Sequence, residues 1–344
     1  MTVTVRSFAK INLGLRIGAA RADGFHELLT VYQTIGLHDV IRVSVKRGAG
    51  IEILCSDPRV PRDESNTCCR IVDLAMRAIG SKGHVVIEIE KRLPVQGGLG
   101  GASANAVAAL LGLECALKMS LPATECLRIA SEVGSDLPLF LVGGTVLGVG
   151  RGEHVYPLAD LPAMACVVVS PRVGVSTPKA FAAWDRMQWL KPCSLEDANA
   201  ALKRRASTVL PQLTASAPSD RMNELSRGFS AWLSGLYSSA PWYGLARRGR
   251  AEKPLLALVR AGIENDFERV VFPEYPELGE GKQALLRAGA EYASLSGSGS
   301  TLYGLFASRE AATKAAARLR KQGWAAQATA TLPRRQYWSR IFDC

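Results

Sequence analysis

A short glycine-rich segment carries the clearest chemical signal in this 344-residue chain. Gly97, Gly98, Gly100 and Gly101 stand between an alternating apolar run and a run of helical composition. Glycine lets the backbone approach a phosphate closely, and the unpaired N–H groups of a first helical turn point at the anion. The order strand, glycine loop, helix is therefore typical of a nucleotide phosphate site, with a tight turn that binds nothing as the alternative.

The spacing of this loop excludes two common nucleotide motifs. No lysine follows the glycines, as a P-loop requires, and Ser103 stands at the third glycine position of the dinucleotide fingerprint. Ser103 and Asn105 are placed to add side-chain donors to the backbone amides. The loop is thus expected to bind a phosphate by another arrangement.

Lys10 and Asp136 are candidates for acid–base chemistry. Lys10 lies in an otherwise apolar strand, where alternation puts it on the same face as Asn12. Asp136 lies in a Gly-Ser-Asp-Leu-Pro segment between a helix end and an apolar run. Such a carboxylate can accept a proton from a hydroxyl nucleophile when a nearby lysine keeps it ionised. A solvent-facing strand for Lys10 and a turn or capping role for Asp136 remain alternatives.

Two further turns could contact a ligand. Phe25 and His26 are neighbours in a turn, and such a pair can stack on a base and hydrogen-bond its edge. The turn Gly297-Ser298-Gly299-Ser300 is rich in backbone amides that could reach an anion. A structural histidine and an ordinary hairpin turn are the alternative readings.

The elements that must position these groups are predicted from apolar periodicity. The first 54 residues alternate as a string of strands, and a β-hairpin is expected around Gly143-Gly144. A domain boundary is expected near residue 160, which gives an amino-terminal domain at 1–160 and a carboxy-terminal domain at 161–344. The second domain is expected to be α+β with an elaboration at about 186–260. The other predicted helices cover 67–79, 102–117, 123–133, 282–289 and 309–322, and the other strands 84–91, 165–170, 292–296 and 301–306.

Composition limits the class of protein more than it defines it. With 48% apolar and 21% charged residues the chain is expected to be globular, and the longest apolar run, 137–149, is too short to span a bilayer. The amino terminus lacks a signal peptide pattern, so a cytoplasmic protein is expected. Eight cysteines without a C-x-x-C pair suit neither a zinc site nor a disulfide framework. The net charge of +11 could serve nucleic acid, an anionic surface or phosphorylated substrates.

Taken in order, these motifs resemble those of the GHMP kinases. The resemblance rests on Ala-Lys-Ile-Asn-Leu at 9–13, Asp-Gly-Phe-His-Glu at 23–27, the loop after Leu93-Pro94, 134–138 and 296–299, and covers about 1–182 and 262–306. It implies an α+β, two-domain fold. The amino-terminal domain would be similar to ribosomal protein S5 domain 2, and the carboxy-terminal domain would be ferredoxin-like, with ligands in the cleft between them.

The resemblance also implies roles. The expected phosphoryl donor is ATP with Mg²⁺, and the expected acceptor is a small cytidine diphosphate sugar alcohol. Asp136 would be the base for the acceptor 2-hydroxyl and Lys10 would support it. The expected ATP-binding residues are Asn66, Lys91, Pro94, Gln96, Gly97, Gly98, Leu99, Gly100, Gly101, Ala102, Ser103, Ala104 and Asn105. The expected substrate-binding residues are Asn12, Phe25, His26, Tyr32, Thr177, Phe181, Gly297 and Ser298, with Tyr32 and Phe181 as apolar walls.

The sequence departs from the commoner family pattern at four positions. Phe25 stands where the family usually has tyrosine, and Gln96, Ala102 and Ala104 replace Gly, Gly and Ser. Two other functions stay open. One is a GHMP kinase of the mevalonate, phosphomevalonate or homoserine type, and the other is a non-catalytic nucleotide- or RNA-binding relative, which the basic balance would suit. Neither membrane nor nucleic-acid partners are expected, and the sequence does not indicate the metal ligands or the oligomeric state.

Overall fold

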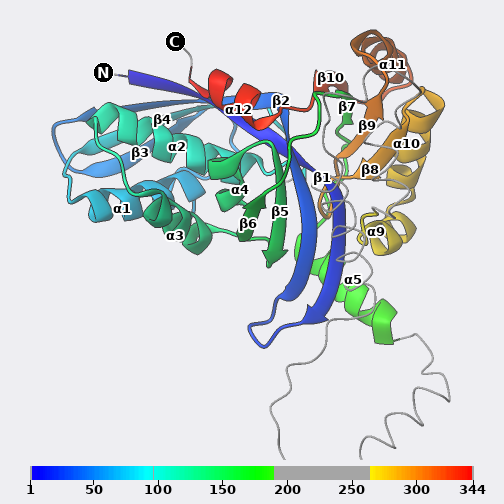
Figure 1. The fold of residues 1–344 in the computed structure, drawn as a ribbon, viewed down its shortest axis with the longest axis horizontal. Coiled ribbons are helices and arrows are strands. Elements are labelled where there is room, and N and C mark those ends of the chain that lie inside the picture. The colour runs from blue at the N-terminus through cyan, green and yellow to red at the C-terminus, as the bar shows by residue number, and fades with distance from the viewer. Residues whose placement is uncertain (1, 96, 190–263, 343–344) are drawn as a thin grey trace, which may run out of the picture.

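Two long strands, β1 (Thr2–Ala20) and β2 (His26–Lys46), form the middle of the molecule (Figure 1). The computed structural model describes residues 2–95, 97–189 and 264–342. β1 and β2 pair antiparallel over most of their length, as their alternating apolar residues favour. The sequence predicted several shorter strands in this region, and the structure has two long ones instead.

The other edge of β2 is shared by two strands. β4 (His84–Glu90) and β5 (Thr145–Gly150) pair antiparallel with different halves of β2. β3 (Gly50–Cys55) lies parallel to β4, and β6 (His154–Pro157) pairs antiparallel with β5. The result is a six-stranded sheet that contains every strand before residue 160.

Four helices enclose the main apolar core of this sheet. α1 (Thr67–Ile79) and α2 (Gly101–Leu117) contact each other, and α2 also packs on β1 and β2. α3 (Ala123–Val133) contacts α1, while α4 (Leu137–Val142) contacts α2 and α3. The predicted bounds of the first helix match those of α1. The helix starts after Asn66, whose side chain caps it, and it ends at Gly80, which has a φ of +70°.

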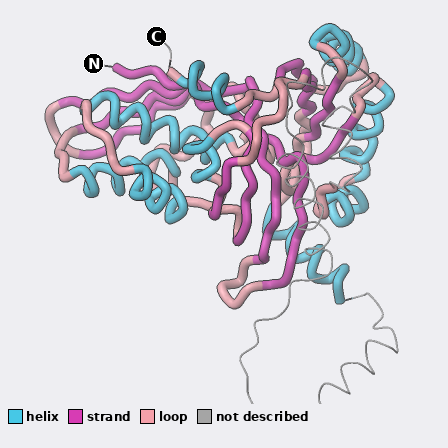
Figure 2. Tube along the Cα trace, viewed as in Figure 1, coloured by secondary structure: helices cyan, strands magenta, loops and turns pink. Residues whose placement is uncertain are grey.

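A second, four-stranded antiparallel sheet follows in the order β10-β7-β9-β8. Helices α10 and α11 pack on this sheet, and α5 contacts α9. Figure 2 shows that the strands of the molecule run between two groups of helices. The predicted α+β class is confirmed. The bounds are α5 (Thr177–Trp189), α9 (Glu268–Glu274), α10 (Pro276–Arg287), α11 (Arg309–Lys321), β7 (Ala165–Val169), β8 (Tyr292–Leu295), β9 (Leu302–Phe306) and β10 (Ala326–Ala330).

An apolar layer joins the two sheets. Ile11 and Leu13 from β1 pack in one buried cluster with Val168 of β7 and Tyr303 and Leu305 of β9. The last helix, α12 (Arg334–Ile341), returns to the first sheet and contacts β1. The change of sheet falls next to the predicted boundary at residue 160, but the division into domains there stays a prediction. Most of the predicted elaboration at 186–260 lies outside the described residues.

The hairpin predicted around Gly143-Gly144 is wrong, because these glycines join α4 to β5. Their physical role is close packing. A Cβ at Gly143 would lie 2.3 Å from the ring of Tyr337, and one at Gly144 would lie 2.3 Å from a carboxylate oxygen of Asp160. The return of α12 therefore depends on this small turn.

The six described cysteines are free thiols, and most of them are buried. Cys55, Cys68, Cys126 and Cys166 are buried, and these four, like the other described cysteines, form no disulfide. Burial raises the pKa of the Cys166 thiol to about 12, which makes it an inert apolar residue. Within residues 2–189 and 264–342, apart from 96, no helix is long and apolar enough to cross a membrane.

We expect Leu110→Ala to lower the free energy of unfolding by about 2–5 kcal/mol, because it removes a fully buried side chain of α2 and leaves a cavity. Urea unfolding followed by circular dichroism measures the change. Leu127→Ala is the matched control on α3, where the side chain is 36% exposed, and should change stability by about 0.5 kcal/mol or less. Equal losses would show that the α2 face does not form the core.

Candidate active site

The glycine loop lies against the turn that connects β8 and β9. Gly98 has a φ of +77°, and a Cβ there would lie 2.2 Å from the Ser296 carbonyl oxygen, so only glycine fits. The Ser296 hydroxyl donates to the Gly98 carbonyl at 2.9 Å, and the Thr301 N–H donates to the Gly97 carbonyl at 3.1 Å. Two glycine turns, 198 positions apart in sequence at Gly98 and Ser296, are thus held together by one bond from a side chain and one between backbone groups.

A cavity of about 350 Å³ opens beside this loop. The amino terminus of α2, which begins at Gly101, faces it with unpaired backbone N–H groups. Ala104 does not line the cavity, because its side chain lies on the buried face of α2, and Gln96 lies outside the described residues. The other predicted ATP-binding residues all line it: Asn66, Lys91, Pro94, Gly97, Gly98, Leu99, Gly100, Gly101, Ala102, Ser103 and Asn105.

Three of these residues also support the cavity wall. The Asn66 side chain accepts from the Cys68 N–H at 2.9 Å and so caps α1. Lys91 places its Nζ 2.6 Å from Oδ2 of the fully buried Asp39, which also accepts two backbone N–H groups. Asn105 accepts from the Ser7 hydroxyl at 2.6 Å. Their side chains therefore fix the loop's surroundings as well as face the cavity.

A second cavity, of about 270 Å³, lies on the other side of the loop. Gly98 and Gly100 line both cavities, so the two spaces meet at the glycine loop. All the predicted catalytic and substrate-binding residues line this second cavity: Lys10, Asn12, Phe25, His26, Tyr32, Asp136, Thr177, Phe181, Gly297 and Ser298. We call it the acceptor cavity.

Lys10 and Asp136 meet at the end of the acceptor cavity next to the loop. Lys10 is buried, and its Nζ lies 3.3 Å from Asp136 Oδ2 and 2.7 Å from Asn12 Oδ1. The Asp136 side chain is 32% exposed, so a substrate can reach it. Asp136 makes no capping hydrogen bond to the first turn of α4, all of which is described. The solvent-facing alternative for Lys10 is therefore wrong. Asp136 does stand in a turn, as the alternative for it had it, but its side chain does not cap α4.

Irregular strand pairing positions Lys10 and Asn12. The register of β1 against β2 shifts between Phe8 and Lys10 and again between Asn12 and Gly14. Such irregularities turn side chains away from the regular alternation and occur often at functional sites. The amide of Asn12 is held in turn, because its Nδ2 donates to Thr30 Oγ1 at 2.7 Å.

Tyr32 has a polar role that the sequence did not indicate. Its hydroxyl donates to Asp136 Oδ1 at 3.0 Å, and Lys10 Nζ lies 5.5 Å from the centre of its ring. Burial, with a smaller effect of the Asp136 charge, raises the pKa of Tyr32 well above its usual range. Tyr32 therefore stays protonated near neutral pH and keeps donating to the carboxylate.

Aromatic rings form the other end of the acceptor cavity. His26 stacks on Phe181 with ring centres 4.9 Å apart, and its Nε2 lies 2.7 Å from an oxygen of Asp185. Phe25 is 49% exposed and has the guanidinium of Arg151 4.9 Å from its ring centre. Flat apolar faces beside a polar histidine edge suit a planar base.

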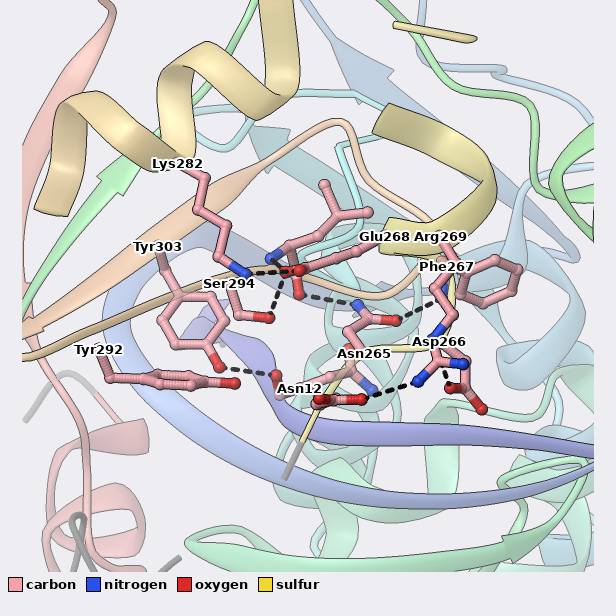
Figure 3. A network of polar contacts seen from close by, with 12 residues as sticks. Asn12, Asn265, Asp266, Phe267, Glu268, Arg269, Lys282, Tyr292, Ser294 and Tyr303 are labelled. Carbon is pink, nitrogen blue, oxygen red and sulfur yellow. Dashed lines mark hydrogen bonds and ion pairs between the residues drawn. The ribbon is translucent and has the colours of Figure 1, made fainter. Parts of the chain in front are cut away.

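A polar network holds the second glycine turn against β1 (Figure 3). The buried Asn265 donates to the carbonyls of Leu295 and Gly297 at 2.9 and 2.8 Å. The next residue along the chain, Asp266, forms a hydrogen bond to β1, in which its backbone N–H donates to the Leu15 carbonyl at 2.9 Å. The hydroxyls of Thr177 and Ser298, which both line the acceptor cavity, are 2.7 Å apart. The wall containing Gly297 and Ser298 is thus fixed from behind.

Several residues of this site were missed from the sequence, among them Asp39, Asn265 and Arg151. Asp39 acts through partners 52 and 53 positions away and Asn265 through partners 30 and 32 positions away, and no local spacing signals such pairs. Arg151 follows a glycine-rich strand, where a single arginine is not distinctive. The run of polar residues Asn265, Asp266 and Glu268 beside apolar Phe267 was the available signal for the network.

Two family models and several named relatives match this chain. The model of the GHMP kinases N terminal domain matches residues 66–144, and that of the GHMP kinases C terminal matches residues 250–324. A 4-diphosphocytidyl-2-C-methyl-D-erythritol kinase from Solibacter usitatus is 36% identical over 90% of this chain and 83% of its own length. The first matched segment contains the glycine loop and Asp136.

Solved structures show the same fold. A crystal structure of 4-(cytidine 5'-diphospho)-2C-methyl-D-erythritol kinase has a TM-score of 0.66 and 28% identity, and the match covers 95% of this chain and 98% of that one. The homoserine kinase of Cytophaga hutchinsonii has a TM-score of 0.63 at 19% identity, with 96% and 95% covered. The second likeness concerns the fold alone.

We expect Gly98→Ala to lower the free energy of unfolding by about 2–4 kcal/mol, because it combines a strained positive φ with a clash against the Ser296 carbonyl. Gly80→Ala is the control, since Gly80 shares the positive φ but has open space around its Cβ position, and it should cost about 1 kcal/mol. Thermal and urea unfolding measure both. If the two variants lose the same stability, the contact between the glycine turns does not constrain the fold.

Proposed function

The chain belongs to the 4-diphosphocytidyl-2-C-methyl-D-erythritol kinase family of the GHMP kinases, and we propose that Asp136 and Lys10 carry its phosphoryl transfer from ATP to the acceptor. The acceptor is 4-diphosphocytidyl-2-C-methyl-D-erythritol, an intermediate of the non-mevalonate route to isoprenoid precursors, and its 2-hydroxyl is the nucleophile. The family relationship supports the reaction, and the geometry of the two cavities supports the residue roles.

One observation carries the proposal: the two cavities meet at Gly98 and Gly100, next to Lys10 and Asp136. ATP bound along the loop would direct its phosphates toward the start of α2, where backbone amides and the helix dipole favour negative charge. An acceptor hydroxyl beside Asp136 would then face the γ-phosphoryl group across the loop. This arrangement suits direct in-line transfer, which depends mainly on positioning.

In the proposed step, Asp136 takes the proton of the 2-hydroxyl while the oxygen forms its bond to the γ-phosphorus. The bond between that phosphorus and the bridging oxygen breaks, and ADP leaves. Lys10, held 2.7 Å from Asn12, keeps a positive charge beside Asp136 and the attacking oxygen. The Tyr32 hydroxyl bonds the other carboxylate oxygen, which leaves Oδ2 facing Lys10.

The cytosine base is assigned to the aromatic end of the cavity. Phe25, His26 and Phe181 offer ring faces there, and stacking on an aromatic side chain contributes about 1–3 kcal/mol per base. Asp185 orients the His26 ring from behind. Phe25 keeps the stacking face of the tyrosine that is usual in the family but lacks its hydroxyl.

Mg²⁺ is proposed as the companion of ATP. Within the described residues, no group of three or more His, Cys, Asp and Glu side chains could hold a metal. Mg²⁺ nevertheless fits, because it is usually bound by one or two protein oxygens together with substrate phosphates and water. The Ser103 hydroxyl, which lines the cavity beside the glycine loop, is the protein group that would hold it, since both oxygens of Asp136 are committed to Tyr32 and Lys10. The ion would neutralise charge on the phosphates.

Asp136→Asn is expected to lower kcat by about 10²- to 10⁴-fold, because the amide cannot accept the hydroxyl proton. ADP release in a coupled assay measures the loss, and circular dichroism checks that the fold is kept. Asp73→Asn, a half-exposed carboxylate on α1, is the matched control and should be fully active. Activity of Asp136→Asn close to that of the unchanged protein would rule out Asp136 as the base.

A panel of acceptors separates this function from other GHMP kinase activities. We expect ADP release with 4-diphosphocytidyl-2-C-methyl-D-erythritol and at least about 100-fold lower kcat/KM with mevalonate, phosphomevalonate or homoserine, because these lack a base to stack at Phe25 and Phe181. The same panel without enzyme gives the background. Equal or better turnover of homoserine would contradict the acceptor assignment.

A further inference from the structure

One cation of the acceptor cavity has no part in the chemistry described so far. Arg151 lies in the turn between β5 and β6 and lines the cavity, with its side chain 31% exposed. The other basic side chains on this wall are Lys10, which is committed to Asp136 and Asn12, and His26, which contacts Asp185. A charged group on the wall of a substrate cavity is a candidate ligand for substrate charge.

Two contacts, one with Glu153 and one with the ring of Phe25, hold the guanidinium of Arg151 in place. Glu153 accepts the Arg151 backbone N–H at 2.6 Å and lies 3.4 Å from its Nε. The ring of Phe25 supports the guanidinium with 4.9 Å between the ring centre and Cζ. Among the residues that the structure describes, no acceptor bonds the two terminal Nη atoms. These are the nitrogens that form paired bonds to a phosphate.

Position along the cavity suggests which phosphate Arg151 would meet. On one side it touches Phe25, at the aromatic end. On the other side its neighbour Gly152 adjoins the reacting end, since a Cβ at Gly152 would lie 2.3 Å from the Tyr32 hydroxyl and 4.0 Å from Asp136 Oδ1. Arg151 therefore lies between the ends assigned to the base and to the alcohol.

We propose that Arg151 binds the diphosphate of the cytidine diphosphate acceptor, an inference that rests on the proposed function. The covalent order of that acceptor is base, diphosphate, alcohol, and the order of Phe25, Arg151 and Asp136 in the cavity is the same. Lys10 is already paired with Asp136 and Asn12, so the charge of the diphosphate requires a second cation in this cavity. Arg151 thus selects acceptors that carry a diphosphate between the base and the alcohol.

The test compares binding of CDP and of cytidine by isothermal titration calorimetry, with the ATP site filled by a non-hydrolysable ATP analogue. The unchanged protein should bind CDP more tightly than cytidine. In Arg151→Met, CDP affinity should fall by about 10- to 100-fold, as for a lost charge-assisted hydrogen bond, while cytidine affinity changes by less than about threefold. Arg151→Lys should recover part of the loss, because it restores the charge without the planar fork.

Steady-state kinetics supply a second measurement on the same variants. The KM for the diphosphate acceptor should rise in Arg151→Met and the KM for ATP should not. Arg172→Met, which removes an arginine from a different cavity, is the matched control and should leave CDP binding as it was. Arg151→Gln serves as a second neutral variant if Arg151→Met does not fold.

Two results would overturn the inference while the unchanged protein remains active. One is a neutral variant that keeps the full preference for CDP over cytidine. The other is an equal loss for CDP and cytidine, which would mean that Arg151 only supports the Phe25 ring. Failure of the unchanged protein to turn over the acceptor would instead refute the proposed function.

Discussion

The contact between the two glycine turns is the constraint on which the rest of the site depends. The backbone at Gly98 passes so close to the Ser296 carbonyl that no side chain can stand between them. On the other side of the loop, the Leu99 carbonyl accepts a hydrogen bond from the Lys10 backbone N–H at 3.0 Å. A single loop therefore borders both cavities and fixes the distance between them, which is what transfer of a group from one ligand to the other requires.

Burial and charge are divided between Lys10 and Asp136 in a way that suits a base. A buried ammonium is costly unless it is paired, and Lys10 has both Asp136 and Asn12 as partners. The carboxylate keeps a third of its surface open, so it can exchange its contact with Lys10 for one with a substrate hydroxyl. Tyr32, protonated because burial raises its pKa, holds the carboxylate in place during that exchange.

Local pattern was sufficient to predict much of this arrangement. The bounds of α1 follow from its apolar stripe, the end of α3 follows from Gly134, and the glycine loop follows from its composition. Lys10 stood out because a charge within an apolar strand needs a partner. What could not be predicted were contacts between segments far apart in sequence: the Tyr32 bond to Asp136, the Lys91 pair with Asp39 and the clamp made by Asn265.

The error at Gly143-Gly144 has the same physical origin. Paired glycines between apolar runs suit a hairpin, and nothing nearby in the sequence shows that Tyr337 of α12 occupies the space beside them. The Tyr337 hydroxyl donates to the Phe140 carbonyl at 2.7 Å, so a residue near the chain's end holds the last turn of the short helix that follows Asp136. The placement of the proposed base therefore depends on both ends of the chain: Lys10 on the first strand contacts its carboxylate, and α12 supports the helix behind it.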